Sequence, residues 1–162
     1  MAHIDVDYDK VGLLAIRDGK ILLCRKKHTT ALLILPGGRR EPGESSMECL
    51  TRELREELGD VTIGAAELIG VYTDRAAGPE TAPPKTVRIE LYRAELIGNP
   101  NACSEIAELV WFGERDDRLQ LAPSIARQIL PDLLARGILL WPRTFRKCRR
   151  IRTADKAGLS TE

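Results

Sequence analysis

The segment that most limits how this chain can fold is LPGGRREPGESSMECLTRELREELGD, residues 35–60. Two adjacent glycines precede a stretch in which Ser45 and Glu48 match a capping box, the S-x-x-E pattern of a helix N-terminus. At about 100° per residue, four apolar side chains fall on one stripe of this helix: Met47, Leu50, Leu54 and Leu58. Gly59 then ends the helix, as a residue just past the C-terminus commonly does. The segment is therefore predicted to be an amphipathic helix that packs through its leucines.

The same helix carries a cluster of acidic residues away from its apolar stripe. Glu53, Glu56 and Glu57 fall within a second arc of about 100° and repel one another unless positive charge lies between them. Carboxylate oxygens are the ligands that Mg²⁺ prefers, and the glycines allow a backbone to approach a bound ion closely. The alternative is a solvated helix face whose glutamates pair with Arg52 and Arg55. The periodicity alone leaves both interpretations open.

Elsewhere the chain alternates short apolar runs with turn signals. Residues 10–27 read as a β-hairpin around Asp18-Gly19, because a tight hairpin turn needs positive φ. Residues 31–36 are predicted to be a short buried strand that ends at Pro36 and the glycines. Further strands are expected at residues 61–73, 86–96 and 107–113.

A second helix is expected at residues 122–137, where Pro131 should kink or split it. A loop, residues 74–85, joins two of the strands and has the length and composition of an active-site rim or a mobile connection. Strands outnumber helices and do not alternate with them strictly. This order favours an α/β (α+β) fold, a mixed sheet with helices on its faces, over a doubly wound parallel sheet.

Composition limits the class of protein. A chain of 162 residues has the size of one ordinary domain. It contains no run of about 18 apolar residues and no secretory signal at its N-terminus, so no membrane partner is expected. Four cysteines are scattered without a C-x-x-C pair: Cys24, Cys49, Cys103 and Cys148. Reduced thiols of this kind indicate a cytoplasmic protein.

The net charge of +1 conceals an uneven distribution. Residues 142–162 hold seven Lys/Arg and two Asp/Glu, which leaves 18 basic and 22 acidic residues in the rest of the chain. We therefore predict a folded domain over residues 1–141 and a basic, flexible tail over residues 142–162. The acidic body argues against a dedicated nucleic-acid partner. The oligomeric state is left open between a monomer and a homodimer.

The spacing of the fixed residues in the opening segment resembles the Nudix box, G-x5-E-x7-R-E-U-x-E-E-x-G-U, where U is a bulky aliphatic residue. Five residues separate Gly38 from Glu44, and seven more separate Glu44 from Arg52-Glu53-Leu54. Arg55, Glu56-Glu57 and Leu58-Gly59 complete the pattern. The last aliphatic position is the exception, because Asp60 stands there and Val61 follows one residue late.

The resemblance implies the Nudix fold, an α/β/α sandwich with a mixed sheet. It also implies Mg²⁺- or Mn²⁺-dependent hydrolysis of a nucleoside diphosphate linked to another group. In this resemblance Glu53, Glu56 and Glu57 are the metal ligands and catalytic carboxylates, with a backbone carbonyl at Gly38 or Gly37 as a further ligand. The side chains that orient them are Glu44 and Arg52.

Other roles follow from the resemblance outside the box. The general base is expected at Glu105, with Glu108 as the second candidate, and Arg25 and Arg39 are expected to hold substrate phosphates. Relatives specific for ADP-ribose carry a proline where Arg75 stands here. A nucleoside triphosphate pyrophosphohydrolase is therefore favoured, ahead of an ADP-ribose or nucleotide-sugar pyrophosphatase. The alternative is a non-catalytic nucleotide- or RNA-binding module on the same fold, for which the basic tail is the supporting feature.

Overall fold

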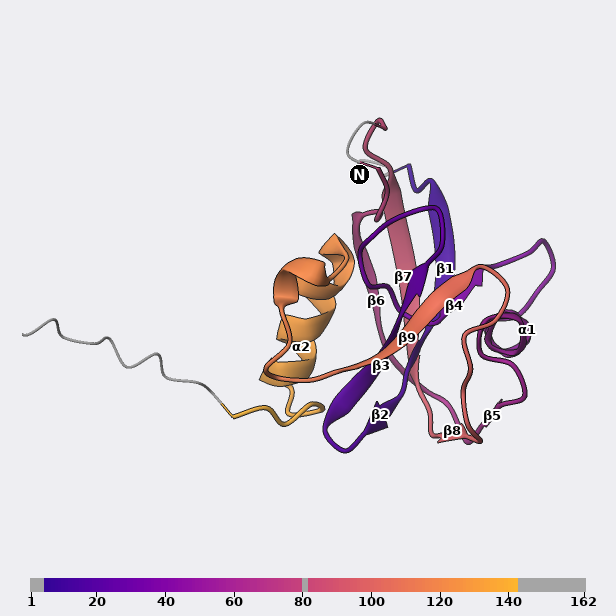
Figure 1. Cartoon of the computed structure of the whole chain (residues 1–162). Coiled ribbons are helices and arrows are strands. Elements are labelled where there is room, and N and C mark those ends of the chain that lie inside the picture. The colour runs from indigo at the N-terminus through magenta and orange to yellow at the C-terminus, as the bar shows by residue number, and fades with distance from the viewer. Residues whose placement is uncertain (1–4, 80–81, 143–162) are drawn as a thin grey trace, which may run out of the picture.

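The computed structural model describes residues 5–79 and 82–142. Two sheets form its middle, with helix α1 on one side and helix α2 on the other (Figure 1), which confirms the predicted mixed α/β architecture. The strands are β1 (Tyr8–Leu14), β2 (Ile16–Arg17), β3 (Lys20–Lys26), β4 (Gly37–Arg39), β5 (Thr62–Ile63), β6 (Glu67–Arg75), β7 (Thr86–Arg93), β8 (Leu96–Ile97) and β9 (Ile106–Phe112). The helices are α1 (Ser46–Leu58) and α2 (Leu130–Ala135). The predicted tail beyond Pro142 lies outside the described residues.

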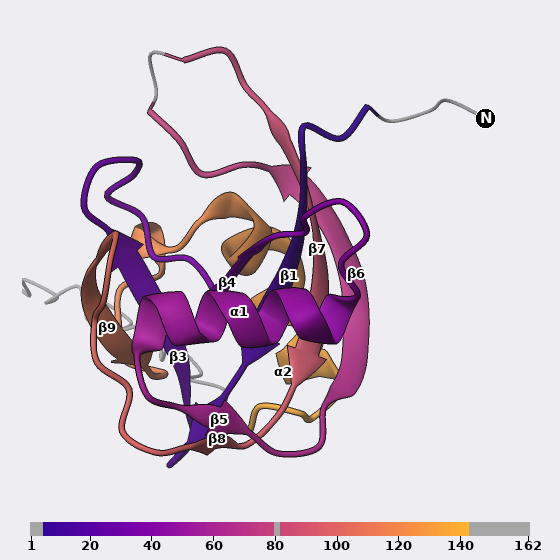
Figure 2. The same cartoon turned by 90° about the vertical axis from the view of Figure 1, so that its right-hand side faces the viewer.

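The larger sheet is mixed. Its strand order is β4-β1-β7-β6, in which β1 and β7 run parallel and the other neighbours run antiparallel. A second, antiparallel sheet has the order β2-β3-β9, and β5 pairs with β8 in a short ribbon. Figure 2 shows that β6 ends and β7 begins at the end of the sheet where β1 begins. The first residues of β1 therefore lie beside the connection between β6 and β7.

The predicted hairpin turn at Asp18-Gly19 is confirmed. Both residues have positive φ, 51° and 71°, as a two-residue hairpin turn requires, and they join β2 to β3 next to the pair Arg17 and Lys20. The residues before the turn belong to two different sheets, because β1 lies in the larger sheet and β2 in the smaller one.

The strand predicted for residues 31–36 is wrong. This apolar segment makes two isolated bridges, Ile34 with Cys24 and Leu33 with Leu121, and the strand forms instead at β4, on the glycines themselves. A Cβ on Gly37, whose φ is 129°, would lie 2.1 Å from the carbonyl oxygen of Val11. Glycine is needed there because β4 approaches β1 too closely for any side chain.

Helix α1 forms as predicted. The Ser45 hydroxyl accepts a 3.2 Å hydrogen bond from the Glu48 backbone N–H, and the Glu48 carboxylate accepts one of 2.7 Å from the Ser45 N–H. The backbone N–H of Gly59 ends the helix by donating to the Arg55 carbonyl. The apolar stripe packs on the sheets through buried Leu50, Leu54 and Leu58, with Met47 at its edge. The opposite edge of the helix is left for the carboxylates.

Pro131 widens the C-terminal helix without splitting it. Residues Ile125–Ile129 form a π-helical turn directly before α2, and the Leu130 N–H donates to the Ile125 carbonyl five residues back. π-Helical turns are rare and occur mostly as single turns inside α-helices, and Pro131 lacks the N–H that would continue the regular hydrogen-bond ladder. The helix covers the other face of the sheets with buried Ile129 and Leu133. None of the helices within the described ranges is long and apolar enough to cross a bilayer.

Candidate active site

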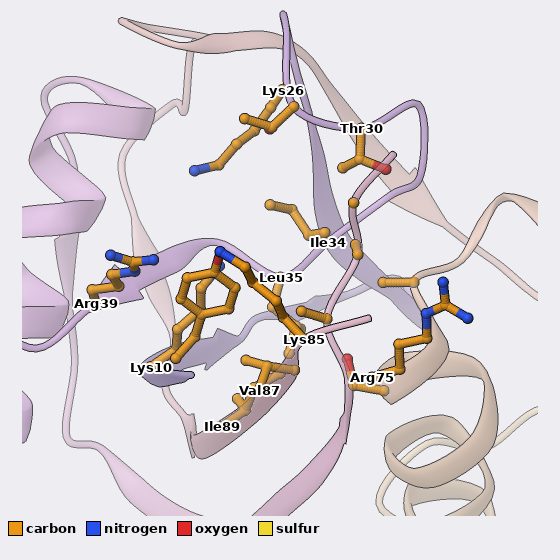
Figure 3. A pocket seen from close by; sticks show the side chains of 18 of the residues that line it. Lys10, Lys26, Thr30, Ile34, Leu35, Arg39, Arg75, Lys85, Val87 and Ile89 are labelled. Carbon is orange, nitrogen blue, oxygen red and sulfur yellow. The ribbon is translucent and has the colours of Figure 1, made fainter. Parts of the chain in front are cut away.

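A cavity of about 560 Å³ lies between the larger sheet and the start of the C-terminal helix (Figure 3). Basic side chains from several elements line it, with Arg39 and Arg75 on opposite sides (Figure 3): Lys10, Lys26, Arg39, Arg75 and Lys85. Apolar side chains line part of it: Ile34, Leu35, Val87, Ile89 and Ile125. Gly37 and Gly38 also line the cavity, which places the glycine pair of the Nudix-like box against it.

Glu57 joins α1 to this wall of the cavity. Its side chain is 2% exposed, and its Oε2 accepts a 2.8 Å hydrogen bond from the backbone N–H of Gly37. Burial raises the pKa of Glu57 to about 7; the negative charges of Glu53 and Glu105 add to this effect, while the Gly37 hydrogen bond and the charge of Lys26 oppose it. Its other oxygen, Oε1, is buried and has no hydrogen-bond partner among the residues that the structure describes. Buried polar atoms normally have a partner, so the unsatisfied oxygen of this carboxylate indicates a position where a ligand binds.

Glu53 lies against the second glycine. A Cβ placed on Gly38 would be 2.2 Å from Cδ of Glu53 and 2.3 Å from its Oε1. The Gly38 carbonyl oxygen faces α1, where it accepts a 3.7 Å contact from the thiol of Cys49. The absence of a side chain at Gly38 therefore allows the Glu53 carboxylate to touch the backbone of β4.

Arg52 ties the acidic residues to the loop before the helix. Its guanidinium donates two hydrogen bonds to Glu44, of 2.7 Å and 3.0 Å, and one of 2.9 Å to Oε1 of Glu53. It also donates to the Arg39 carbonyl at 3.1 Å. The paired guanidinium holds the pKa of Glu44 at about 2. These contacts join Glu44 and Arg52 to Glu53, and the orienting role of the pair stays a prediction.

Glu56 is placed differently from the other two glutamates. Its side chain is 57% exposed on the outer surface of α1, and its Oε1 lies 3.9 Å from Arg52. Among residues 5–79 and 82–142, no three His, Cys, Asp or Glu side chains form a group that could hold a metal ion as they stand. Arg52 balances part of the charge on Glu53 and Glu56, so joint ligation by all three glutamates stays a prediction.

The donor set nevertheless fits a hard divalent cation. The unpartnered Oε1 of Glu57 and the Glu53 carboxylate are oxygen donors, and both lie against the glycines of β4. Mg²⁺ and Mn²⁺ favour such ligands and retain waters in the remaining positions. Glu53 and Glu57 are the residues that would hold the ion, and the predicted contribution of Glu56 requires its side chain to turn inward.

The two arginines expected to hold phosphates are placed unequally. Arg39 lines the cavity, with its guanidinium carbon 4.1 Å from the centre of the Tyr8 ring. Arg25 is not among the lining residues; its Nε pairs with Glu108 at 2.7 Å and its Nη2 donates to Gln120 at 3.0 Å. Arg39 thus lies where a substrate phosphate could reach it, and its phosphate-binding role stays a prediction. Arg25 lies outside the cavity lining, and its donors serve contacts within the protein.

The candidates for the general base are also separated by the structure. Glu105 forms an ion pair with Lys26, which lines the cavity, and its charge acts on Glu57. Glu108 pairs with Arg25 away from the cavity lining. Glu105 is therefore the better placed of the two.

Several residues of the site have no counterpart among the sequence predictions. Tyr8, Lys10, Lys26 and Lys85 all line the cavity. In the sequence, Lys10 and Lys26 stand at the ends of strands, where a charged residue is usually solvated. The pairing of Lys10 with Arg39 across β1 and β4 is what brings these charges together, and no periodicity reveals it.

Comparison with known proteins agrees with this fold. The family model for the NUDIX domain matches residues 8–133. The chain therefore belongs to the Nudix family, the class of proteins whose fold and box the structure displays.

Particular relatives add detail. A protein of Pseudomonas fluorescens (strain Pf0-1) named NAD-capped RNA hydrolase NudC is 30% identical over 78% of this chain and 44% of its own length. The CTP pyrophosphohydrolase of Escherichia coli (strain K12) is 45% identical over 33% of this chain and 43% of its own length. The chain thus spans less than half the length of these curated relatives.

Solved structures show the same architecture. The solution structure of the E. coli ORF135 protein has a TM-score of 0.57 and 30% identity, and covers 91% of this chain and 94% of its own. A Nudix hydrolase from Nitrosomonas europaea has a TM-score of 0.64 at 22% identity, which shows likeness of fold.

Proposed function

We propose that this protein is a metal-dependent Nudix hydrolase that cleaves a phosphoanhydride bond in a nucleoside diphosphate linked to another group. The observation that carries the proposal is the buried carboxylate of Glu57 at the wall of a basic cavity. Its Oε2 is fixed by Gly37, and its Oε1 has no partner within residues 5–79 and 82–142. A site that combines unsatisfied carboxylate oxygen with cations suits a metal-bound diphosphate.

Glu57 and Glu53 would hold Mg²⁺ or Mn²⁺, with Glu56 as the third predicted ligand. When bound, such an ion supplies Lewis-acid stabilisation of the charge that develops on the diphosphate. Arg52 keeps Glu53 oriented through its bonds to Glu44 and Glu53.

The remaining residues act on water and phosphate. Glu105 accepts the proton of the attacking water, and its ion pair with Lys26 holds its carboxylate beside the cavity. Lys10 and Arg39 neutralise phosphate oxygens of the substrate. The apolar part of the cavity, around Leu35 and Ile89, takes the nucleoside.

A nucleoside triphosphate is the favoured substrate, released as nucleoside monophosphate and pyrophosphate. The E. coli relative named as a CTP pyrophosphohydrolase supports this choice through a match that covers 33% of this chain. ADP-ribose and nucleotide sugars come next. The relatives named as NAD-capped RNA hydrolases add capped RNA to the compounds that need testing. We also propose a cytoplasmic location, because the scattered cysteines are expected to be reduced thiols.

A panel of substrates tests this function. Nucleoside triphosphates, ADP-ribose, a nucleotide sugar and NAD-capped RNA would be incubated with the protein and Mg²⁺, and the products separated by chromatography. We expect metal-dependent release of a nucleoside monophosphate, with ¹⁸O from labelled water in one product. Binding of nucleotide without turnover, and without any need for Mg²⁺, would instead identify the non-catalytic binding module.

A further inference from the structure

Three basic side chains surround one aromatic ring in the cavity. The guanidinium carbon of Arg39 lies 4.1 Å from the centroid of Tyr8, the ammonium of Lys85 lies 5.3 Å from it, and that of Lys10 lies 5.9 Å from it. They come from β4, from the residue before β7 and from β1. The electron-rich faces of an aromatic ring attract cations, so Tyr8 partly offsets the repulsion among these charges.

These cations lack the partners that other basic residues of the protein have. Arg40, Arg52 and Arg88 each form an ion pair with Asp or Glu. Within the described part of the chain, neither Lys10, Arg39 nor Lys85 lies within 4.0 Å of a carboxylate oxygen. The cluster therefore holds positive charge that an anion would balance.

The environment of Lys10 agrees with this excess of charge. Burial lowers the pKa of its ammonium, and the nearby charges of Lys26 and Arg39 lower it further, while Glu57 and Glu105 act in the opposite direction. Both the burial and the neighbouring cations therefore disfavour the charged form of Lys10. A bound polyanion relieves the repulsion among like charges.

The position of the cluster relative to the rest of the site indicates which anion it binds. Tyr8 and Lys10 pair with Val87 and Ile89 across β1 and β7, so the cations border the apolar part of the cavity. Arg39 follows Gly38, the residue that touches the Glu53 carboxylate. We place the base of a nucleotide in the apolar part of the cavity and its diphosphate at the glycines. Its outermost phosphates can then contact these cations.

We propose that Lys10, Arg39 and Lys85, arranged around the ring of Tyr8, bind the terminal phosphates of a nucleoside triphosphate and select it over diphosphate-linked sugars. The inference rests on the proposed hydrolysis, and it adds the residues that set the substrate class. A sugar offers no charge at this position, whereas the terminal phosphates offer oxygens for each of the three cations.

Binding of inorganic triphosphate to the metal-free protein tests the cluster without turnover. Calorimetry in EDTA should show that Lys85→Gln weakens triphosphate binding about tenfold, and that Tyr8→Leu weakens it while Tyr8→Phe, which keeps the ring, does not. Lys20→Gln, which removes an exposed lysine at the β2–β3 turn, is the matched control and should have no effect. Unchanged binding by Lys85→Gln would overturn the proposal. So would an equal loss of affinity for a single-stranded RNA without a 5′-triphosphate, because the cluster would then recognise phosphodiesters.

Kinetics provide the second test. Lys85→Gln should lower kcat/KM for a nucleoside triphosphate about tenfold and leave that for a nucleotide sugar within about twofold. An equal loss on both substrates would overturn the proposed selectivity while leaving the hydrolase function intact. Should the wild-type protein hydrolyse neither substrate, the proposed function fails, and the calorimetric comparison still decides whether the cluster binds triphosphate.

Discussion

The carboxylate of Glu57 and the backbone N–H of Gly37 meet in a 2.8 Å hydrogen bond that spans 20 positions of the sequence. The bond connects the last turn of α1 to the first residue of β4. It fixes one oxygen of Glu57, while the other, Oε1, is buried without a partner in the described part of the chain. The position of this carboxylate is therefore set by the fold before any ligand arrives, which is the arrangement that a metal site needs.

Substitution of Gly38 by alanine should displace Glu53. The added Cβ would lie 2.2 Å from Cδ of Glu53, so the carboxylate must leave its place against β4. We expect Mn²⁺ affinity, measured by electron paramagnetic resonance, to fall at least tenfold, and stability to fall by about 1–3 kcal/mol. Gly64→Ala is the control, because the nearest atom to its Cβ is 3.7 Å away, an ordinary contact. Equal Mn²⁺ binding by Gly38→Ala and the wild type would contradict the placement of Glu53.

The stability of the metal-free protein should depend on the protonation of Glu57. Its pKa is raised from 4.5 to about 7 in the folded state, so the folded protein retains a proton that the unfolded chain has lost in this range. The stabilisation is complete below about pH 4.5 and is lost as the pH rises to about 7, with a total change of at most about 3 kcal/mol. Urea unfolding in EDTA should show this decline for the wild type, and Glu57→Gln should lack it. Parallel pH profiles for the two proteins would show that Glu57 is not the responsible group.

Replacement of Arg52 by lysine should loosen the acidic residues without removing charge. A lysine cannot make the two hydrogen bonds to Glu44 and the bond to Glu53 at the same time. Metal affinity is expected to fall about 10- to 100-fold, as it does when the residues that orient ligands are changed. Arg55→Lys on the exposed face of the same helix should behave like the wild type. Calorimetric titration with Mn²⁺ compares the two variants directly.

The two candidates for the general base can be separated kinetically. Glu105→Gln should lower kcat about 100-fold or more with little change in KM, because it removes the group that accepts the proton. Glu108→Gln should keep kcat within about twofold, since its carboxylate serves the ion pair with Arg25. The opposite result would assign the base to Glu108 and show that the ion pair with Lys26 restrains Glu105.

The features that could be predicted from the sequence are those that depend on residues close together in the chain. The capping box at Ser45 and the turn at Asp18-Gly19 depend on residues close in sequence, and both form as expected. The strand assigned to residues 31–36 failed because its hydrogen bonds go to two different partners: Leu33 bonds with Gln120 and Ala122, and Ile34 with Cys24. An apolar run indicates burial, and the partners that decide whether a strand forms lie elsewhere in the chain.

Some residues of the candidate site could likewise be predicted from the sequence, and others could not. The resemblance to the Nudix box predicted Glu53, Glu56 and Glu57 as ligands, whereas the exposed position of Glu56 and the internal pairing of Arg25 appear only in the assembled structure. Lys10 and Lys85 are 75 positions apart in sequence and reach one ring because β1 and β7 run parallel. Such convergence depends on strand order, and the hydrophobic pattern of a single strand does not encode it.

Anomalous diffraction from crystals soaked in Mn²⁺ with a non-hydrolysable nucleoside triphosphate analogue tests whether Glu57 and Glu53 hold the metal ion. We expect an anomalous peak at ligand distance, about 2.1–2.3 Å, from Oε1 of Glu57, with a Glu53 oxygen also coordinated and the analogue's phosphates bound to the same ion. An analogue bound in the cavity without such a peak, and with Oε1 of Glu57 still unpartnered, would contradict this expectation.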